Sequence, residues 1–377
     1  MDFSLSEQEK MLQKMAREFA TKVVAPQAAG IDSSAEFPHD LAKELGKQGY
    51  LGLPYPTEYG GGGAGYLSYT LVLEQICQAQ ATVGAIMSVN TLAQEAIFRF
   101  GSETQKQTYL TPSTQGRLIT CFAFTDPETG SDPKAFTTIA RKSDAGYIVN
   151  GQKQFVALAP AAGLAIVFAR REAGDDLNAF IVSTSAPGFE LHQPGETMGL
   201  RGLGISVAYL NEVCVPRENR LGKEGQGFDI LLEAISVGRL GVATQAVGIA
   251  QAALELATGY ARQRRALGQP ISKMPSIQWH LAEMAAGIEA ARWQVYRTAS
   301  HRDQGLSIRY ESAIAKLFAS QQAVAATSRA MQVAGAYGAM KSLPLERLYR
   351  DAKMTEIYEG VSEIQRSIIA RYLIERP

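Results

Sequence analysis

The segment Arg350–Arg366 (RDAKMTEIYEGVSEIQR) holds the residues whose types and spacing best fit a chemical site. Glu359 supplies a carboxylate, one of the groups that can exchange a proton with a bound molecule. Tyr358 places an amphipathic ring beside it, and Gly360 permits backbone conformations that other residues resist. Taken alone, the pattern also suits an ordinary solvated loop acid, since most glutamates lie on protein surfaces.

Two helices must position this carboxylate. Pro344 can open a helix at its first turn, and apolar residues at helical spacing, such as Leu345 and Leu348, carry that helix to about residue 356. Ser362 followed three residues later by Gln365 predicts a capping box at the start of a second helix. Glu359 and Gly360 therefore occupy a tight connection, toward which the second helix points its positive end.

The same segment resembles the C-terminal signature of the acyl-CoA dehydrogenase family, of the short- or branched-chain type. The matching residues are Arg350 to Lys353, Ile357 to Gly360 and Glu363 to Arg366. In that family the Glu-Gly pair carries the catalytic base. The resemblance therefore implies that Glu359 takes the α proton of an acyl-CoA thioester, with Tyr358 and Gly360 beside the substrate.

Further segments resemble the family's cofactor-binding elements. Ala123–Asp132 (AFTDPETGSD) is similar to a flavin-binding signature. The match implies that Phe124 and Thr125 lie along the flavin ring, and that Ser131 lies near the phosphates and the substrate. Gly151–Ala157 (GQKQFVA) resembles the stretch whose Trp and Thr flank the ring; here these positions are Phe155 and Ala157.

Three more matches lie in the last third of the chain. Tyr260–Ile271 (YARQRRALGQPI) resembles the segment that reaches the flavin of a neighbouring subunit, which implies that Arg264 binds the pyrophosphate and that Leu267 replaces a phenylalanine. Gln332 and Gly335 match a glycine-rich element at the adenine side of FAD. Arg239 matches an arginine beside the catalytic loop.

Four of these positions depart from the family pattern. Phe155, Ala157, Leu267 and Val361, the last in place of a threonine, each remove a polar or aromatic contact. Loss of one hydrogen bond typically costs about 0.5–1.5 kcal/mol. We expect FAD to bind, but less tightly than is usual in the family.

Composition excludes several other classes of function. Lys plus Arg and Asp plus Glu both number 37, so the chain has no bulk charge for nucleic acid or an acidic membrane surface. Its three cysteines and four histidines lack metal-like spacing, which predicts free thiols within the core and no structural metal. No basic leader followed by an apolar run opens the chain, so we expect a soluble, cytoplasmic protein without a membrane segment.

The order of the patterns predicts an α+β fold. Helical periodicity covers residues 1–120, short β-prone runs separated by turns cover 121–225, and long helical patterns return over 226–377. The resemblance implies an N-terminal helical domain, a middle antiparallel β domain and a C-terminal four-helix bundle. It also implies a homotetramer, as a dimer of dimers.

Three functions follow from these observations. The first is a flavin-dependent acyl-CoA dehydrogenase that forms a trans-2-enoyl-CoA, with the β hydride passing to flavin N5 and the electrons to an electron-transfer flavoprotein. The second keeps the scaffold but acts as an enoyl-CoA reductase or a redox-neutral lyase, as the altered Phe155 and Ala157 allow. The third is a subunit of a hetero-oligomer whose partner chain completes the FAD site.

Overall fold

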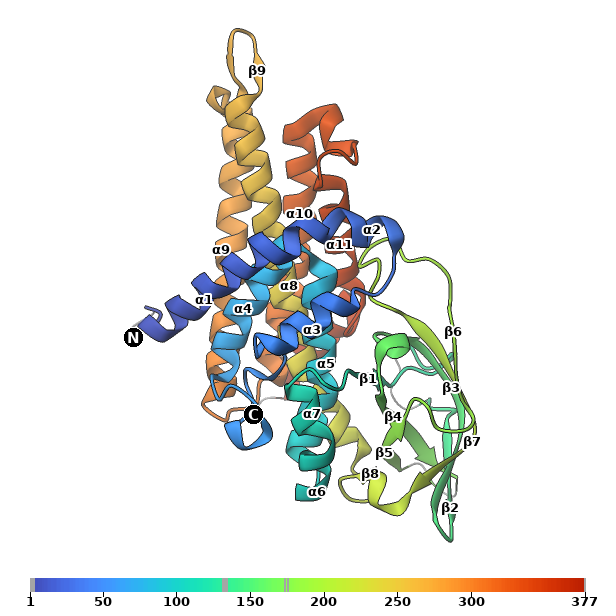
Figure 1. The fold of residues 1–377 in the computed structure, drawn as a ribbon. Coiled ribbons are helices and arrows are strands. Elements are labelled where there is room, and N and C mark those ends of the chain that lie inside the picture. Colours follow the sequence, from blue (N-terminus) through green and yellow to red (C-terminus); the bar gives the residue numbers. More distant parts are fainter. Residues whose placement is uncertain (1–3, 131–134, 173, 175, 376–377) are drawn as a thin grey trace.

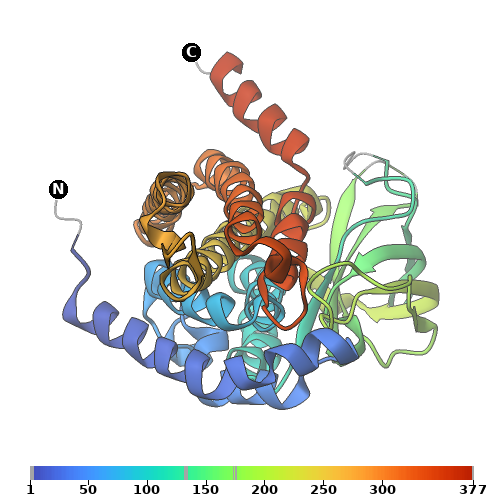
Figure 2. The same ribbon diagram turned by 90° about the horizontal axis from the view of Figure 1, so that it is seen from above.

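The chain passes from helices to strands and back to helices, as predicted (Figure 1). The computed structural model describes residues 4–130, 135–172, 174 and 176–375. The sheet lies at one side of the helical body, the first helix runs along the edge of this body, and the last helix projects from it (Figure 2).

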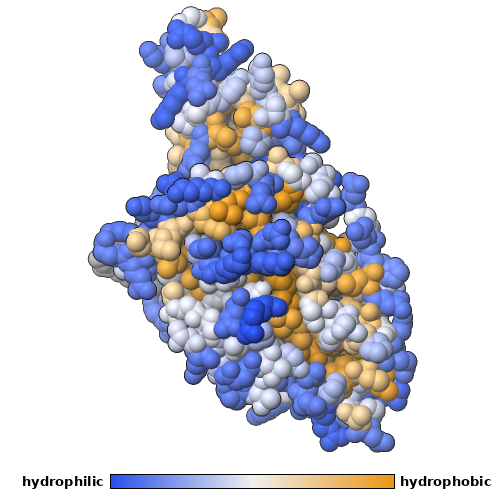
Figure 3. Space-filling view, in the orientation of Figure 1, coloured by the Kyte–Doolittle hydropathy of each residue, from blue (hydrophilic) through white to orange (hydrophobic). Residues whose placement is uncertain are grey.

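The N-terminal part is built around two buried helices, α4 (Gly65–Ala79) and α5 (Ala81–Phe100). Around them lie α1 (Glu7–Phe19), α2 (Ala28–Ser34), α3 (His39–Lys47), α6 (Glu103–Gln105) and α7 (Thr111–Thr114). The outer helices are polar where they face solvent, and hydrophobic residues show between their polar rows and at their border with the sheet (Figure 3). Apolar side chains on the inner faces thus hold these helices to α4 and α5.

The sheet contains β1 (Thr120–Ala123), β2 (Ile139–Ser143), β3 (Gly146–Val156), β4 (Leu164–Arg171), β5 (Leu177–Ser183), β6 (Phe189–His192), β7 (Ser206–Pro216) and β8 (Arg220–Leu221). Its main order is β6-β7-β3-β2-β4-β5-β8, and β1 pairs with β4. Most pairs are antiparallel, as predicted for this domain, but β4 runs parallel to both β1 and β2. The chain crosses over between these strands instead of turning back in a hairpin, which allows the parallel pairing.

The C-terminal part is a bundle of α8 (Gly227–Gln263), α9 (Pro275–Asp303), α10 (Arg309–Ala334) and α11 (Leu345–Ile357), followed by α12 (Ser362–Glu375). Helix α8 is the centre of the molecule, because α4, α5, α9, α10 and α11 all pack against it. By length and composition alone α8 could span a membrane, but 83% of its most apolar window is buried inside the protein. Its hydrophobic residues therefore form the shared core of both helical parts.

Two features lie outside this core. A short hairpin of β9 (Arg265–Ala266) and β10 (Gln269–Pro270) extends beyond the end of α8 and α9 (Figure 1). Of the three free cysteines, Cys77 and Cys121 are buried but Cys214 is exposed. The expectation that all three are core residues is wrong for Cys214, because it lies on the solvent face of β7.

Candidate active site

Glu359 and Gly360 form the connection between α11 and α12. Both have positive φ, +56° at Glu359 and +90° at Gly360. The left-handed conformation is unfavourable for a residue with a β-carbon and persists only where neighbouring contacts hold it. A β-carbon at Gly360 would stand 2.7 Å from Gln365 Nε2, so a side chain at this position would displace the Gln365 amide.

The predicted capping box at Ser362 is absent, which is a correction to the sequence analysis. Ser362 Oγ is buried and has no hydrogen-bond partner among the residues that the structure describes. Gln365 instead donates from Nε2 to the carbonyl oxygens of Gly360, at 2.8 Å, and Glu359, at 3.3 Å. Helix α12 begins one residue earlier than a Ser362 cap requires, and the carbonyl of Val361 accepts its first backbone hydrogen bonds. The amide of Gln365 therefore secures the loop rather than the helix start.

The carboxyl group of Glu359 lies against the backbone of α8. A β-carbon built on Gly238 would stand 2.8 Å from Glu359 Oε2 and 2.6 Å from Leu92 on α5. Burial raises the pKa of Glu359 to about 7, although the nearby cations Arg239 and Lys316 act to lower it. This carboxyl group can therefore gain or lose a proton near neutral pH.

Arg239 lies beside the loop, as the resemblance implied. It is 6% exposed, and its Nε has no hydrogen-bond partner in the described part of the chain. Burial lowers the pKa of its guanidinium to about 10, while the charge of Glu359 favours the protonated form. Arg239 thus brings a buried positive charge to the site.

Lys316 is a second buried cation, which sequence analysis missed. Its Nζ donates to the carbonyl oxygen of Gly360 at 2.7 Å. The sequence carried a usable signal, because Lys316 falls at helical spacing within a row of buried small residues on α10 that includes Ser312, Ala319 and Ala323. A lysine in such a row must have a specific partner.

Tyr358 connects the loop to the helical core. Its hydroxyl donates to Gln245 Oε1 at 2.5 Å, and Gln245 Nε2 donates to Ser88 Oγ at 2.5 Å. Neither Gln245 on α8 nor Ser88 on α5 was identified from sequence. The three residues form a polar chain that leads from the partly buried Tyr358, beside Glu359, into the core and fixes the Tyr358 ring.

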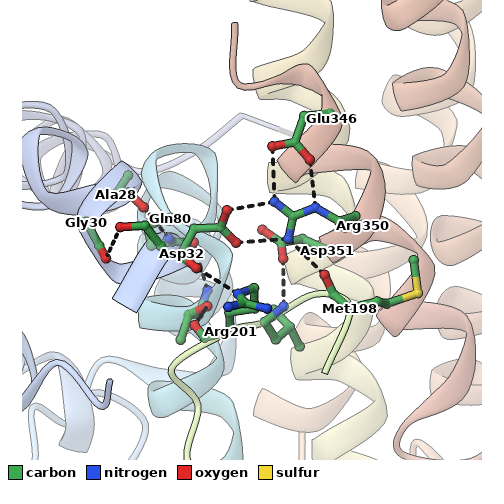
Figure 4. A network of polar contacts seen from close by, with 12 residues as sticks. Ala28, Gly30, Asp32, Gln80, Met198, Arg201, Glu346, Arg350 and Asp351 are labelled. Carbon is green, nitrogen blue, oxygen red and sulfur yellow. Dashed lines mark hydrogen bonds and ion pairs between the residues drawn. The ribbon is translucent and has the colours of Figure 1, made fainter. Parts of the chain in front are cut away.

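Helix α11 is fixed at its middle by a cluster of charges (Figure 4). Arg350 binds both carboxylate oxygens of Asp32, at 2.9 and 2.7 Å, and those of Glu346, at 2.7 and 3.1 Å. The adjacent Asp351 accepts a hydrogen bond from the Leu200 backbone at 2.7 Å, and burial raises its pKa to about 6. These contacts hold the helix that ends at the candidate base against α2 and the segment before β7.

The predicted flavin-binding turn is braced by a buried ion pair. Asp126 accepts hydrogen bonds from the backbone and hydroxyl groups of Thr137 and Thr138 and pairs with the ammonium of Lys153. Lys153 also donates to the carbonyl of Phe124 at 3.0 Å. Phe124 and Thr125 are thereby held at the end of β1, whereas Ser131 lies outside the described residues.

A β-bulge turns Phe155 out of the sheet. The register of β3 against β7 shifts between Lys153 and Val156, and Phe155 has φ +54°. Its ring is 67% exposed, whereas Ala157 two residues later is partly buried against the core. Such a ring, exposed at a cost in backbone energy, is a suitable surface for a planar ligand.

The remaining predicted cofactor residues gather at another place. Arg264, at the end of α8, lies over the ring of Tyr337 at 6.0 Å, next to the turn that follows Gln332 and Gly335. Leu267 is 93% exposed on the tip of the β9–β10 hairpin, beyond the end of the bundle (Figure 1). Within one chain the structure brings Arg239, Tyr358, Glu359, Gly360 and Val361 together but does not bring the hairpin to them.

Comparison with known proteins assigns all three parts of the chain. Models of the acyl-CoA dehydrogenase N-terminal, middle and C-terminal domains match residues 6–117, 121–213 and 225–374. A Bacillus subtilis protein named acyl-CoA dehydrogenase is 42% identical over 374 residues, which are 98% of this chain and 99% of the relative. The acryloyl-CoA reductase (NADH) of Anaerotignum propionicum is 39% identical over an aligned length of 381, which covers 100% of this chain and 97% of the relative.

Two solved structures of related proteins match this chain over its whole length. A structure described as an electron transferring flavoprotein of Acidaminococcus fermentans contains a chain with a TM-score of 0.98 and 38% identity. Butyryl-CoA dehydrogenase from Megasphaera elsdenii gives a TM-score of 0.97 at 37% identity. In both comparisons 100% of each chain is covered.

Proposed function

The chain belongs to the acyl-CoA dehydrogenase family, and we propose that it catalyses the α,β-dehydrogenation of a short-chain acyl-CoA thioester with FAD. The observation that carries this proposal is the Glu359 carboxyl group, held against Gly238 with its pKa raised to about 7. A base with a pKa near the working pH is efficient in proton abstraction. The short-chain class is supported by the similarity to butyryl-CoA dehydrogenase.

The residues of this chain suit a flavin. Phe155 offers an exposed aromatic face, the Phe124–Asp126 turn offers braced backbone groups, and Arg264 offers a guanidinium of the kind that binds phosphate bidentately. A flavin supplies the hydride-accepting chemistry that no amino-acid side chain possesses. Because the hairpin that follows Arg264 extends away from its own body, we propose that Arg264 and Leu267 serve the site of a neighbouring subunit in a homotetramer.

Glu359 removes the α proton, and the rest of the loop keeps its carboxylate in place. Its positive φ and the bonds to the Gly360 carbonyl fix the direction of the side chain. Arg239 and Lys316 favour the ionised carboxylate that is needed before proton transfer, and burial keeps it basic. Tyr358, fixed by Gln245, closes the site toward the core.

The test is an anaerobic titration of the purified, FAD-loaded protein with propionyl-, butyryl-, isobutyryl- and octanoyl-CoA. We expect butyryl-CoA or another short thioester to bleach the flavin absorbance, and we expect E359Q to prevent bleaching. Glu212→Gln is the matched control, because Glu212 also has positive φ, +51°, but lies exposed on β7. If no thioester bleaches the flavin, the proposed function is wrong.

A second candidate function is the reduction of an enoyl-CoA, which the similarity to acryloyl-CoA reductase favours. The two functions differ in the fate of the electrons. A dehydrogenase stops after one turnover without an acceptor and continues when an electron-transfer flavoprotein is added, whereas a reductase consumes enoyl-CoA when NADH and its flavoprotein partner are supplied. A redox-neutral lyase would turn over repeatedly with neither.

The flavin content separates the hetero-oligomer alternative from both. We expect about one FAD per chain in the protein purified alone, because the models of all three domains of the family match this chain. A chain that binds FAD only after a second polypeptide is added would instead be one subunit of a larger enzyme.

A further inference from the structure

Lys316 lies in the middle of α10 and is 0% exposed. Placing an ammonium group in a protein interior is costly unless hydrogen bonds or opposite charges compensate for the lost water. The hydrogen-bond partner of a fully buried lysine therefore indicates the role of that lysine.

The partner of Lys316 is the loop that carries Glu359. Nζ of Lys316 and Nε2 of Gln365 both donate to the carbonyl oxygen of Gly360, at 2.7 and 2.8 Å. This carbonyl directly follows Glu359, whose φ of +56° is unfavourable without support. Two donors from different helices, α10 and α12, thus hold one strained loop.

Lys316 can also contribute charge to the site. Burial lowers the pKa of its ammonium to about 7. The charges of Glu359, of Glu356 on α11 and of Glu363 on α12 act to raise this pKa, and Arg239 acts to lower it. Arg309, on the same helix as Lys316, acts to lower the pKa of Arg239. The ammonium donates to a loop carbonyl rather than to the carboxylate, so it can attract the charge on Glu359 without occupying the oxygens that must accept a proton.

We propose that Lys316 is a positioning residue of this site: its side chain anchors the Gly360 carbonyl, which orients the preceding Glu359, and its protonated form supplies a positive charge that favours the ionised Glu359 carboxylate. The proposal rests on the function proposed for Glu359. Lys316 and Gln365 anchor the same carbonyl, but only Lys316 can carry a charge.

The two roles have different consequences for the pKa of Glu359. The positive charge of Lys316 lowers that pKa, so its removal must raise it. Loss of the neutral Gln365 side chain removes one hydrogen bond from the loop and leaves the charge in place. A structural role for Lys316 would affect folding but would not move the protonation of Glu359.

The experiment is an infrared titration of the FAD-loaded protein without any thioester. The C=O stretch of the protonated Glu359 carboxyl group is identified by its loss in E359Q, and its midpoint is measured in wild type, K316M, K316Q and Q365L. We expect a midpoint near 7 in wild type, an upward shift in both Lys316 variants, and a smaller shift in Q365L. No change in K316Q, or an equal change in Q365L, would overturn the proposal.

A reciprocal measurement keeps the test decisive if the Lys316 variants do not fold. Because Glu359 raises the pKa of Lys316, E359Q must lower the pKa of the lysine, measured from its ¹³Cε resonance in selectively labelled protein. An unchanged lysine pKa in E359Q would contradict the coupling. Neither measurement needs substrate turnover, so failure of the thioester titration would disprove the proposed function without deciding the role of Lys316.

Discussion

Gly238 on α8 approaches Glu359 so closely that a β-carbon there would stand 2.8 Å from the carboxylate oxygen Oε2. The glycine therefore makes the space in which the candidate base lies. We expect Gly238→Ala to displace the carboxylate and to lower kcat by roughly 10²-fold, the cost of a misplacement of about 1 Å.

The control for this substitution is Gly259→Ala on the same helix. A β-carbon at Gly259 meets nothing within 4 Å, and alanine favours a helix over glycine by about 0.5–1 kcal/mol. Gly259→Ala should raise Tm slightly and leave kcat unchanged. Equal kinetic losses in the two variants would mean that the Gly238–Glu359 contact has no special role.

The rate should depend on pH through Glu359. Because proton abstraction needs the carboxylate, kcat/KM should rise with pH through a pKa of about 7. Arg239 lowers this pKa, so Arg239→Gln should move the rise of kcat/KM to higher pH. Arg17→Gln, at an exposed position on α1, should not move it. If kcat/KM rises at the same pH in Arg239→Gln as in wild type, a group other than Glu359 sets the pH dependence.

The exposed ring of Phe155 should contribute to flavin binding rather than to folding. Loss of an aromatic contact is worth about 1 kcal/mol, so Phe155→Ala should weaken FAD binding by roughly five- to tenfold. Phe155→Gly should weaken it similarly without lowering the Tm of the apoprotein, because glycine adopts φ +54° without strain. FAD retained per chain and apoprotein unfolding are measured side by side, with Phe228→Ala as the control for another exposed phenylalanine.

The Asp126–Lys153 pair should be essential to the flavin-binding turn. Both side chains are fully buried, so Asp126→Ala leaves an uncompensated ammonium and should cost about 3–5 kcal/mol of unfolding free energy. Adding Lys153→Met removes that charge, and the double variant should be more stable than Asp126→Ala alone. Urea denaturation of wild type, Asp126→Ala, Lys153→Met and the double variant measures the coupling between the two residues. Purely additive effects on the unfolding free energy would contradict this coupling.

Asp351 should make stability depend on pH. Burial raises its pKa to about 6 in the folded protein, above an unfolded value of about 4. Its contribution to stability is full below pH 4 and is lost as pH rises through 6, a difference of roughly 3 kcal/mol. Asp351→Asn cannot ionise but can still accept the bond from Leu200, so its unfolding free energy should change less between pH 5 and pH 8 than that of wild type. An identical pH dependence in the two proteins would exclude Asp351 as the cause.

Local signals in the sequence were sufficient for the loop at Glu359. The periodicity after Pro344 gave a helix that ends at Ile357, one residue from the expected position, and Gly360 adopts the positive φ that its type allows. The same signals misassigned Ser362, because a capping box and a side chain that reaches back to loop carbonyls have the same spacing. Gln365 shares the carbonyl oxygen of Gly360 with Lys316 on α10, and no local spacing indicates that contact.

The amino-acid sequence by itself determined which segments become helix or strand and which residue types stand at the loop, because periodicity, glycines and helix-opening residues act over a few neighbours. Only the tertiary structure decided that Gly238 and Lys316, more than 40 residues from Glu359, meet it, that β4 lies parallel to β1, and that the hairpin with Leu267 extends away from its own chain. The environment of a buried charge is set by every element packed around it, and no short window of sequence contains those elements. The raised pKa of Glu359 is therefore a property of the fold.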